Sequence, residues 1–275
     1  MLIFEDTTFG SQKCELNLLE LYPNKDKRLD FQKRFDSFIE SGTSNPWIFC
    51  LRDNILRYKS EVFVSDKCDD RPPLLLLLGN PASHSVEAGM CFAYEKGGGE
   101  HRYWKILNDT GILTFVDQSP LSENYHITNE MKRNALSELN YLSPFRIGIA
   151  VFYSLPTSAS DPKWSGVNGV KRLLGAKAFE TISIEEERRI DGLISKFLGD
   201  QGGIIAFQKD AYNRLRSEDT PAYSIDLSNQ GLLMGKYKRS KNILLAGSPS
   251  TRLIQSVDGK SALLKFKDWL YQSYQ

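Results

Sequence analysis

Residues 74–92 read L-L-L-L-L-G-N-P-A-S-H-S-V-E-A-G-M-C-F, and this stretch decides the fold class. The five leucines at its start are too few for a helix with turns at both ends, and they lack the polar alternation of a half-exposed strand. They therefore predict a strand that is buried on both faces, as in a parallel sheet. Residues 79–81 end this strand in a turn, and a helix is expected to begin near Val86, with Ser83 or Ser85 as its cap.

The turn after the leucines is the first candidate for chemistry. In open α/β sheets, ligands bind beyond the carboxyl ends of the parallel strands, which is where Asn80 and His84 fall. An Asn-Pro turn is also an ordinary way to reverse the chain. A histidine in a turn is more often a hydrogen-bonded structural residue than a catalyst. The residue types alone leave both interpretations open.

Composition excludes several classes of protein. The chain has 275 residues, of which 41% are hydrophobic and 25% are charged, as in a globular protein of one large or two small domains. Its formal net charge is +1, so any binding to nucleic acid must use a local basic patch. No apolar run approaches the ~20 residues that span a bilayer, and residues 1–10 carry acids rather than a basic signal region. We therefore expect a soluble, cytoplasmic protein that does not bind membranes.

The cysteines and histidines do not indicate a metal site. Cys14, Cys50, Cys68 and Cys91 form no C-x-x-C pair, so they are expected to be reduced and mostly buried. The three histidines are too scattered for a ligand set. The glycines at 97–99 lack the Gly-Lys-Ser/Thr pattern of a phosphate-binding loop. We expect neither a metal nor a cofactor.

The order of apolar segments predicts an α/β protein with a mostly parallel sheet over residues 74–275. Residues 1–73 are predicted to be an amino-terminal extension packed on that core, with an amphipathic helix at 28–41. Further elements are expected as strands at 147–152, 203–207 and the start of 242–255, and as helices at 170–174, 183–198 and 212–216. Glu185, Glu186 and Glu187 are expected in the solvated first turn of the 183–198 helix.

Gly79, Asn80 and the proline after them, followed by G-M-C-F at 89–92, resemble the first signature motif of the uracil-DNA glycosylase superfamily. In that family a buried strand ends in Gly-x-Asp-Pro or Gly-x-Asn-Pro, and a segment a little further on supplies an aromatic ring. Here no residue separates Gly79 from Asn80. The resemblance implies a three-layer αβα sandwich with a mostly parallel central sheet.

Residues 242–255, N-I-L-L-A-G-S-P-S-T-R-L-I-Q, resemble the second motif of the same family. There a strand ends in His-Pro-Ser or Asn-Pro-Ser, and a following residue wedges into the DNA helix. Ser250 and the proline before it match, whereas Ser248 stands where many members have histidine or asparagine. The contact with the charge that develops on the base is therefore weakened or supplied otherwise. Arg252 or Leu253 is the implied wedge.

The resemblance implies a monofunctional glycosylase that hydrolyses the N-glycosidic bond of uracil or another modified base flipped out of DNA. The implied catalytic residues are Asn80, His84 and Ser248. Asn80 holds the attacking water, because an amide takes up no proton near neutral pH. Backbone N–H groups of the turn at 80–84 are expected to stabilise the anionic base. The family's uracil-reading asparagine has no counterpart between residues 146 and 156, so the target base stays open.

Base binding is assigned through the resemblance to Gly79, to Phe92 as a stacking ring, and to Tyr153. A core tyrosine with a satisfied hydroxyl is the alternative for Tyr153. The implied DNA-binding residues are Ser85, Ser250, Thr251, Arg252 and Leu253. A local basic patch of Lys236, Lys238, Arg239 and Lys241 has a plain solvated loop as its alternative.

Two other functions remain open at this point. The first is a catalytically weak or inactive DNA-binding or scaffold protein with the same fold, which the departures from both motifs favour. The second is a nucleoside or nucleotide hydrolase, because a base pocket without a wedge could act on free substrates. DNA containing a damaged or modified base is the expected partner, and the protein is expected to be a monomer.

Overall fold

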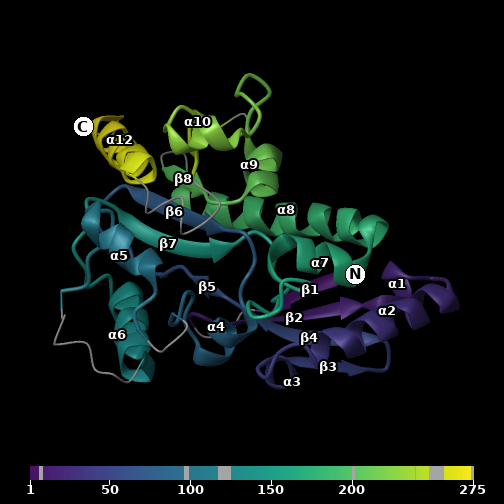
Figure 1. Cartoon of the computed structure of the whole chain (residues 1–275). Helices are drawn as coiled ribbons and strands as arrows, with labels where there is room; N and C mark the ends of the chain where they lie inside the picture. Colours follow the sequence, from purple (N-terminus) through teal and green to yellow (C-terminus); the bar gives the residue numbers. More distant parts are fainter. Residues whose placement is uncertain are drawn as a thin grey trace. The chain divides into compact units, whose positions relative to one another are not determined.

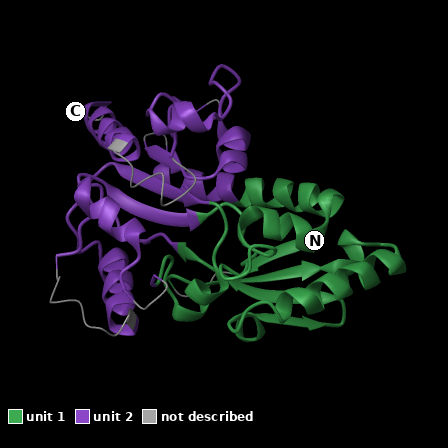
Figure 2. Ribbon diagram, viewed as in Figure 1, with its two compact units in different colours: residues 1–62, 79–93, 151–189 green, residues 63–78, 94–150, 190–275 purple. Residues whose placement is uncertain are grey.

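The computed structural model describes residues 1–5, 9–95, 99–116, 125–199, 202–238, 240–247 and 257–273 of the chain. Within these ranges the chain divides into two compact units (Figure 2). Unit 1 comprises Met1–Val62, Gly79–Ala93 and Val151–Arg189, and unit 2 comprises Phe63–Leu78, Tyr94–Ala150 and Ile190–Gln275. The expected division of the chain at residues 73 and 74 stays a prediction.

Unit 1 contains a four-stranded antiparallel sheet with the strand order β1-β2-β4-β3 (Figure 1). The strands are β1 (Leu2–Glu5), β2 (Gln12–Asn17), β3 (Phe49–Arg52) and β4 (Ile55–Ser60). Three helices belong to the same stretch of chain: α1 (Leu18–Leu21), α2 (Lys25–Ile39) and α3 (Asn45–Ile48). Buried and exposed residues alternate along β4, as expected when one face of a sheet packs on a core.

Helix α2 confirms the amphipathic helix expected near residues 28–41. Phe31, Phe35 and Phe38 recur at helical spacing and are buried. Asn24 caps the helix, because its side-chain oxygen accepts a hydrogen bond from the Asp26 backbone N–H at 2.7 Å. Leu29 is apolar too, but it is 51% exposed, since it lies outside the stripe that the three phenylalanines form.

Glu61 follows β4 directly and is an unusual buried acid. The side chain is 2% exposed, and its Oε1 has no hydrogen-bond partner in the part of the chain that the structure describes. Burial disfavours the charged carboxylate and raises the pKa of Glu61 to about 8.

The second sheet has six strands in the order β5-β7-β6-β8-β10-β9. In chain order they are β5 (Val62–Phe63), β6 (Pro73–Leu78), β7 (Arg146–Val151), β8 (Gly203–Ala206), β9 (Met234–Lys236) and β10 (Ile243–Ala246). Strand β8 pairs in parallel with β6 and with β10, and β9 pairs antiparallel with β10. The expected mostly parallel sheet in an α/β protein is confirmed, with a separate antiparallel sheet in addition.

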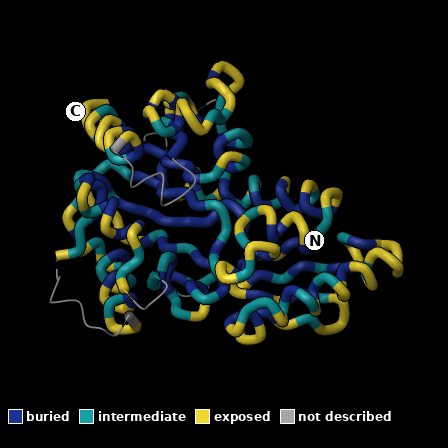
Figure 3. Tube along the Cα trace, viewed as in Figure 1, coloured by how far each residue is buried: buried dark blue, intermediate teal, exposed yellow. Residues whose placement is uncertain are grey.

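Strand β6 lies in the interior of this sheet. All five leucines at 74–78 are buried, as predicted from their unbroken run. Figure 3 shows the inner strands in dark blue, the colour of buried residues. The chain passes from β6 to β7 on one side and then returns to β8 and β10 on the other side. The direction of winding therefore reverses between β6 and β8, which is the position where open α/β sheets bind ligands.

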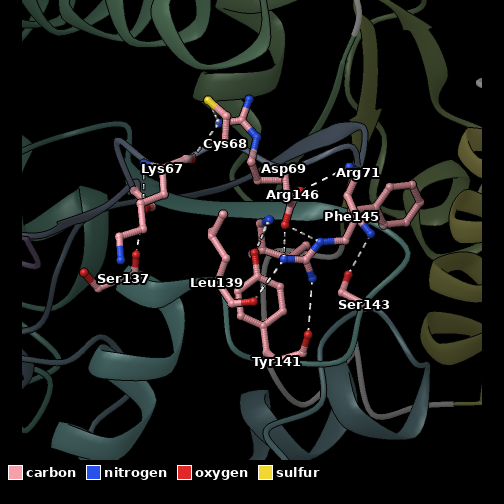
Figure 4. A network of polar contacts seen from close by, with 12 residues as sticks. Lys67, Cys68, Asp69, Arg71, Ser137, Leu139, Tyr141, Ser143, Phe145 and Arg146 are labelled. Atoms are coloured by element: carbon pink, nitrogen blue, oxygen red, sulfur yellow. Dashed lines mark hydrogen bonds and ion pairs between the residues drawn. The ribbon is translucent and has the colours of Figure 1, made fainter.

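A polar network holds the chain where it enters β6 (Figure 4). The Arg71 guanidinium donates to the Asp69 carboxylate, to the Leu139 carbonyl oxygen at 3.1 Å and to the Tyr141 carbonyl oxygen at 3.2 Å. It also lies over the Tyr141 ring, 4.5 Å from the centroid. Desolvation raises the pKa of Asp69, but its hydrogen bonds from Arg71 outweigh this and lower the pKa overall. Arg71 thus ties the loop before β6 to the loop before β7.

The remaining described helices are α4 (Ser83–Ala88), α5 (Arg102–Asp109), α6 (Tyr125–Glu138), α7 (Gly166–Leu174), α8 (Ala176–Leu198), α9 (Lys209–Leu215), α10 (Ile225–Asn229) and α12 (Val257–Ser273). No helix in the described ranges is long and apolar enough to cross a membrane.

Two expectations about helix starts are wrong. Neither Ser83 nor Ser85 caps α4, because both lie inside the helix; Ala82 is the capping residue, and no side chain bonds to the helix start. Helix α8 begins at Ala176 rather than near residue 183, since its apolar face already includes Phe179. Glu186 consequently lies in the middle of a helix.

The expectation of mostly buried cysteines is correct for only two of the four. Cys14 and Cys91 are buried, whereas Cys50 and Cys68 are exposed. Cys50 lies on β3 and Cys68 on the loop before β6, and neither position points a side chain into a core.

Candidate functional site

The turn after β6 is paired with the segment that follows β7, and both segments belong to unit 1. Tyr153 donates its backbone N–H to the Gly79 carbonyl oxygen at 2.8 Å. The Thr157 backbone N–H donates to the Pro81 carbonyl oxygen at 3.0 Å, and the Thr157 carbonyl oxygen accepts from the Ser83 backbone N–H at 2.9 Å. These three bonds fix the turn carrying Asn80 against residues 153–157.

The Asn80 amide has a defined orientation. Its Nδ2 donates to Thr157 Oγ1 at 2.8 Å, to the Pro81 carbonyl oxygen at 3.2 Å and to the Leu155 carbonyl oxygen at 3.4 Å. Because carbonyl oxygens only accept hydrogen bonds, the nitrogen must be the atom that faces them. Asn80 Oδ1 has no hydrogen-bond partner among the described residues, and the side chain is half-buried. Asn80 thus presents a fixed hydrogen-bond acceptor.

His84 and Ser85 lie in the first turn of α4. Ser85 is buried, and its Oγ lies 3.5 Å from His84 Nε2. Desolvation lowers the pKa of His84, and the Glu87 carboxylate opposes this only in part. His84 is therefore a neutral imidazole at pH 7, able to donate from one ring nitrogen and accept at the other. Its catalytic role and the DNA contact of Ser85 stay predictions.

One of the turn's backbone N–H groups is already bonded within the protein. The Ser83 N–H donates to the Thr157 carbonyl oxygen because the two segments are paired, so it is not available to a ligand. The anion-binding role of the other N–H groups at 80–84 stays a prediction. The Ser83 hydroxyl, in contrast, is buried and has no hydrogen-bond partner within the described ranges.

Phe92 has a left-handed backbone conformation, with φ at +50°. This region is unfavourable for a residue with a Cβ and a bulky ring, and such residues gather at functional sites. Phe92 as a residue is half-buried. A strained aromatic residue therefore stands at the position that the first motif assigns to base stacking.

We expect Phe92→Gly to unfold at a higher urea concentration than Phe92→Ala. Both variants lose the ring, but only glycine removes the left-handed strain, which is worth about 1 kcal/mol. The free energies of unfolding of the two variants give the difference directly. Ala93 has a negative φ, so Ala93→Gly is the matched control and is expected to lower stability. An alanine variant as stable as the glycine variant would contradict the strain at Phe92.

Tyr153 is a core residue. Its side chain is fully buried, with ring centroids 4.9 Å from Phe152 and 5.0 Å from Phe179. The Ser183 hydroxyl donates to the Phe179 carbonyl oxygen at 2.7 Å, and its oxygen lies 3.3 Å from the Tyr153 hydroxyl, which can donate to it. The environment agrees with the alternative of a core tyrosine with a satisfied hydroxyl, and a contact between Tyr153 and a base stays a prediction.

Behind the paired segments lies a buried ion pair that sequence reasoning missed. Glu186 Oε2 lies 2.8 Å from Arg189 Nε, and their side chains are 1% and 8% exposed. Glu186 Oε1 accepts hydrogen bonds from the Ser154 backbone N–H at 2.6 Å and from the Ser154 hydroxyl. Arg189 donates to the carbonyl oxygens of Val151 at 2.6 Å and Phe152 at 3.0 Å. The pair therefore fixes the chain as it leaves β7.

Two neutral groups complete this network. The Tyr58 hydroxyl lies 2.8 Å from Ser154 Oγ. Desolvation and the charge of Glu186 raise the pKa of the Cys14 thiol to about 12, and desolvation raises that of Tyr58 well above its usual range. Both groups stay protonated at pH 7. The cluster therefore contains one carboxylate, one guanidinium and neutral donors around them.

A signal for the burial of Glu186 exists in the sequence. Ile182, Glu186 and Ile190 are spaced by four residues, so they share one face of a helix. Both isoleucines are buried. The run of three glutamates at 185–187 predicts a solvated helix start. The helical period, however, places Glu186 alone of the three on the apolar face.

A scan against models of known protein families finds no match, and a search of curated proteins finds no relative. Within the described part of the chain, no group of three or more His, Cys, Asp or Glu side chains could hold a metal ion. The assignment of a function therefore depends on the chemistry of the site.

The residues that carry the second motif lie outside the described residues. These are Ser248, Ser250, Thr251, Arg252 and Leu253. The strand before them is present as β10 (Ile243–Ala246), as predicted. Of the expected basic patch, Arg239 also lies outside the described residues, and Lys238 Nζ is 2.5 Å from Asp191 Oδ2. Lys236 and Lys241 are exposed.

Proposed function

We propose that this protein is a monofunctional DNA glycosylase that hydrolyses the N-glycosidic bond of uracil or another modified base. The orientation of Asn80 carries the proposal. Its amide nitrogen is taken up by three protein acceptors, and its oxygen has no partner among the described residues. An oxygen fixed in this way can accept a hydrogen from a water molecule and hold that water for attack on the sugar.

The chemistry of an amide sets the order of bond breaking. Asn80 cannot take a proton from the water, so it cannot generate a hydroxide as a carboxylate would. The glycosidic bond must then be largely broken before the water adds, which leaves an oxocarbenium-like sugar and an anionic base. A site of this kind depends on the leaving ability of the base, and we expect it to favour bases whose anions are stable.

Two further residues support the handling of an extruded base. Stacking of a base on an aromatic side chain is worth roughly 1–3 kcal/mol, which helps to offset the cost of removing the base from the duplex. Phe92 is a half-buried aromatic residue in a strained backbone conformation. His84, as a neutral imidazole, can donate a hydrogen bond to a carbonyl oxygen of the base.

The topology of the sheet supports the same location. Asn80 follows β6 by two residues, and β6 borders the point where the winding of the sheet reverses. We propose that the mostly parallel sheet is the centre of a three-layer αβα sandwich like that of the uracil-DNA glycosylase superfamily. DNA carrying the modified base is the proposed partner.

Base release from oligonucleotides tests the proposal. Duplex and single-stranded oligonucleotides that carry uracil, hypoxanthine, xanthine or an oxidised pyrimidine are incubated with the protein and then treated with alkali. Strand cleavage that needs both the protein and the alkali supports a monofunctional glycosylase, and an unmodified oligonucleotide is the control.

The same assay separates the other two functions. Binding that weakens steeply with salt, without release of any base, would instead indicate a DNA-binding or scaffold protein. Release from mononucleotides alone would indicate a nucleoside or nucleotide hydrolase. Either result would overturn the proposed activity.

A further inference from the structure

Thr157 makes the shortest contact with the Asn80 amide. The distance from Asn80 Nδ2 to Thr157 Oγ1 is 2.8 Å, whereas the two backbone carbonyl oxygens lie at 3.2 Å and 3.4 Å. Hydrogen bonds of the N–H to oxygen type are strongest near 2.9 Å and weaken beyond about 3.2 Å. The two carbonyl oxygens decide which amide atom faces inward, and the threonine hydroxyl holds that atom in place.

The Thr157 side chain is itself well fixed. Its residue is 2% exposed, and its backbone bonds to both Pro81 and Ser83. A β-branched side chain has few χ1 rotamers, so a fixed backbone also fixes the hydroxyl. The segment that leads to Thr157 is fixed at its start by the Glu186–Arg189 pair, whose side chains bond to the backbone of residues 151, 152 and 154. The chain is therefore held by side chains of α8 at residues 151–154 and reaches Thr157, and through it the Asn80 amide, three residues later.

We infer that Thr157 is a positioning residue, which holds the Asn80 oxygen where it binds the attacking water. This inference rests on the proposed function and adds to it a residue that neither motif contains. Without the hydroxyl, the Asn80 amide keeps only its two weaker bonds and rotates more freely. The water is then held in the reactive position for a smaller fraction of the time. Substrate binding is unaffected, because Thr157 acts through Asn80.

Kinetics of three variants test the role of the hydroxyl. Thr157→Val has nearly the same shape as threonine without the hydroxyl, and we expect it to lower kcat by about 10-fold, the effect of losing one good hydrogen bond. KM for the oligonucleotide is expected to stay within twofold of wild type. Thr157→Ser restores the hydroxyl and is expected to recover kcat. Thr181→Val, on the outer part of α8, is the matched control and leaves both constants unchanged.

The side-chain amide of Asn80 gives a readout that needs no activity. With selectively isotope-labelled asparagine, NMR measures how fast the Asn80 Nδ2 hydrogens exchange with water. We expect exchange to become faster in Thr157→Val and to return to the wild-type rate in Thr157→Ser. If wild type releases no base but exchange responds in this way, the proposed function fails while the anchoring of Asn80 holds.

Two results would overturn the inference. One is a wild-type enzyme that releases base while Thr157→Val keeps full kcat and unchanged exchange. The other is an equal loss of kcat in the valine and serine variants, which would show that the position matters for packing and not for its hydroxyl.

Discussion

Replacing Asn80 with alanine lowers kcat for base release by about 100- to 1000-fold. The variant removes the acceptor that holds the water, and loss of one preorganised polar contact at a reacting centre has an effect of this size. The effect exceeds that expected for Thr157→Val, because the alanine variant removes the whole amide rather than one of its anchors. KM for the oligonucleotide changes little, since Asn80 acts on the water rather than on the DNA. Steady-state kinetics on the best substrate from the release assay measure both constants.

Asn140→Ala provides the control for this change. Asn140 is exposed and lies in unit 2, so its truncation leaves kcat at the wild-type value. Urea unfolding checks that Asn80→Ala is folded. We expect it to be, because Asn80 is half-buried and its removal costs little stability. Full activity in a folded Asn80→Ala protein would refute the assignment of Asn80 as the water-binding residue. The proposed function would then lose its main support.

Glu186→Gln lowers the free energy of unfolding by about 3–5 kcal/mol. The substitution keeps the shape of the side chain and removes its charge, so the Arg189 guanidinium stays buried without a counter-ion. Breaking a buried pair from one side has this cost because the remaining charge cannot be solvated. Urea unfolding at neutral pH measures the loss.

The neighbouring pair on the same helix is a matched control. Glu185 and Arg188 have the same spacing and a distance of 2.8 Å, but their side chains are 29% and 69% exposed. Glu185→Gln is therefore expected to change stability by less than about 1 kcal/mol. Replacing both Glu186 and Arg189 with apolar residues leaves no buried charge but also leaves the Ser154 N–H and the Val151 and Phe152 carbonyl oxygens without these partners, so it is expected to recover only part of the loss. Equal effects of Glu185→Gln and Glu186→Gln would show that burial does not strengthen the inner pair.

The elements that could be predicted from the sequence are those whose pattern is local. The leucines at 74–78 form β6 because a strand inside a parallel sheet needs apolar residues on both faces, and the turn after them follows from Gly79 and Pro81. The four-stranded sheet of residues 2–60 was not anticipated. Its strands have only four to six residues, and the pairing that joins β2 to β4 is remote in the chain, so no local period reveals the sheet.

The same distinction applies to the candidate site. Asn80 could be identified because it directly follows a recognisable strand. Thr157 is 77 residues away from Asn80, and its contact depends on the pairing of two segments after two different strands. Glu186 was assigned to solvent because charged residues next to one another suggest a surface. Its burial depends on a core that forms only when the helix packs on residues far away in the chain.

Glu61, the acid that follows β4, makes the stability of this protein depend on pH. Glu61 has a pKa of about 8 in the folded protein, above the 4.5 of an exposed glutamate. Between these two values the native state retains a proton that the unfolded chain has lost, so folding at pH 7 takes up a proton at this residue. The contribution of Glu61 to stability is therefore fully present below about pH 4.5 and is lost progressively as the pH rises from there to about 8. Each rise in pH above about 4.5 thus weakens the native state through this one carboxyl group, and the loss is complete only above about pH 8.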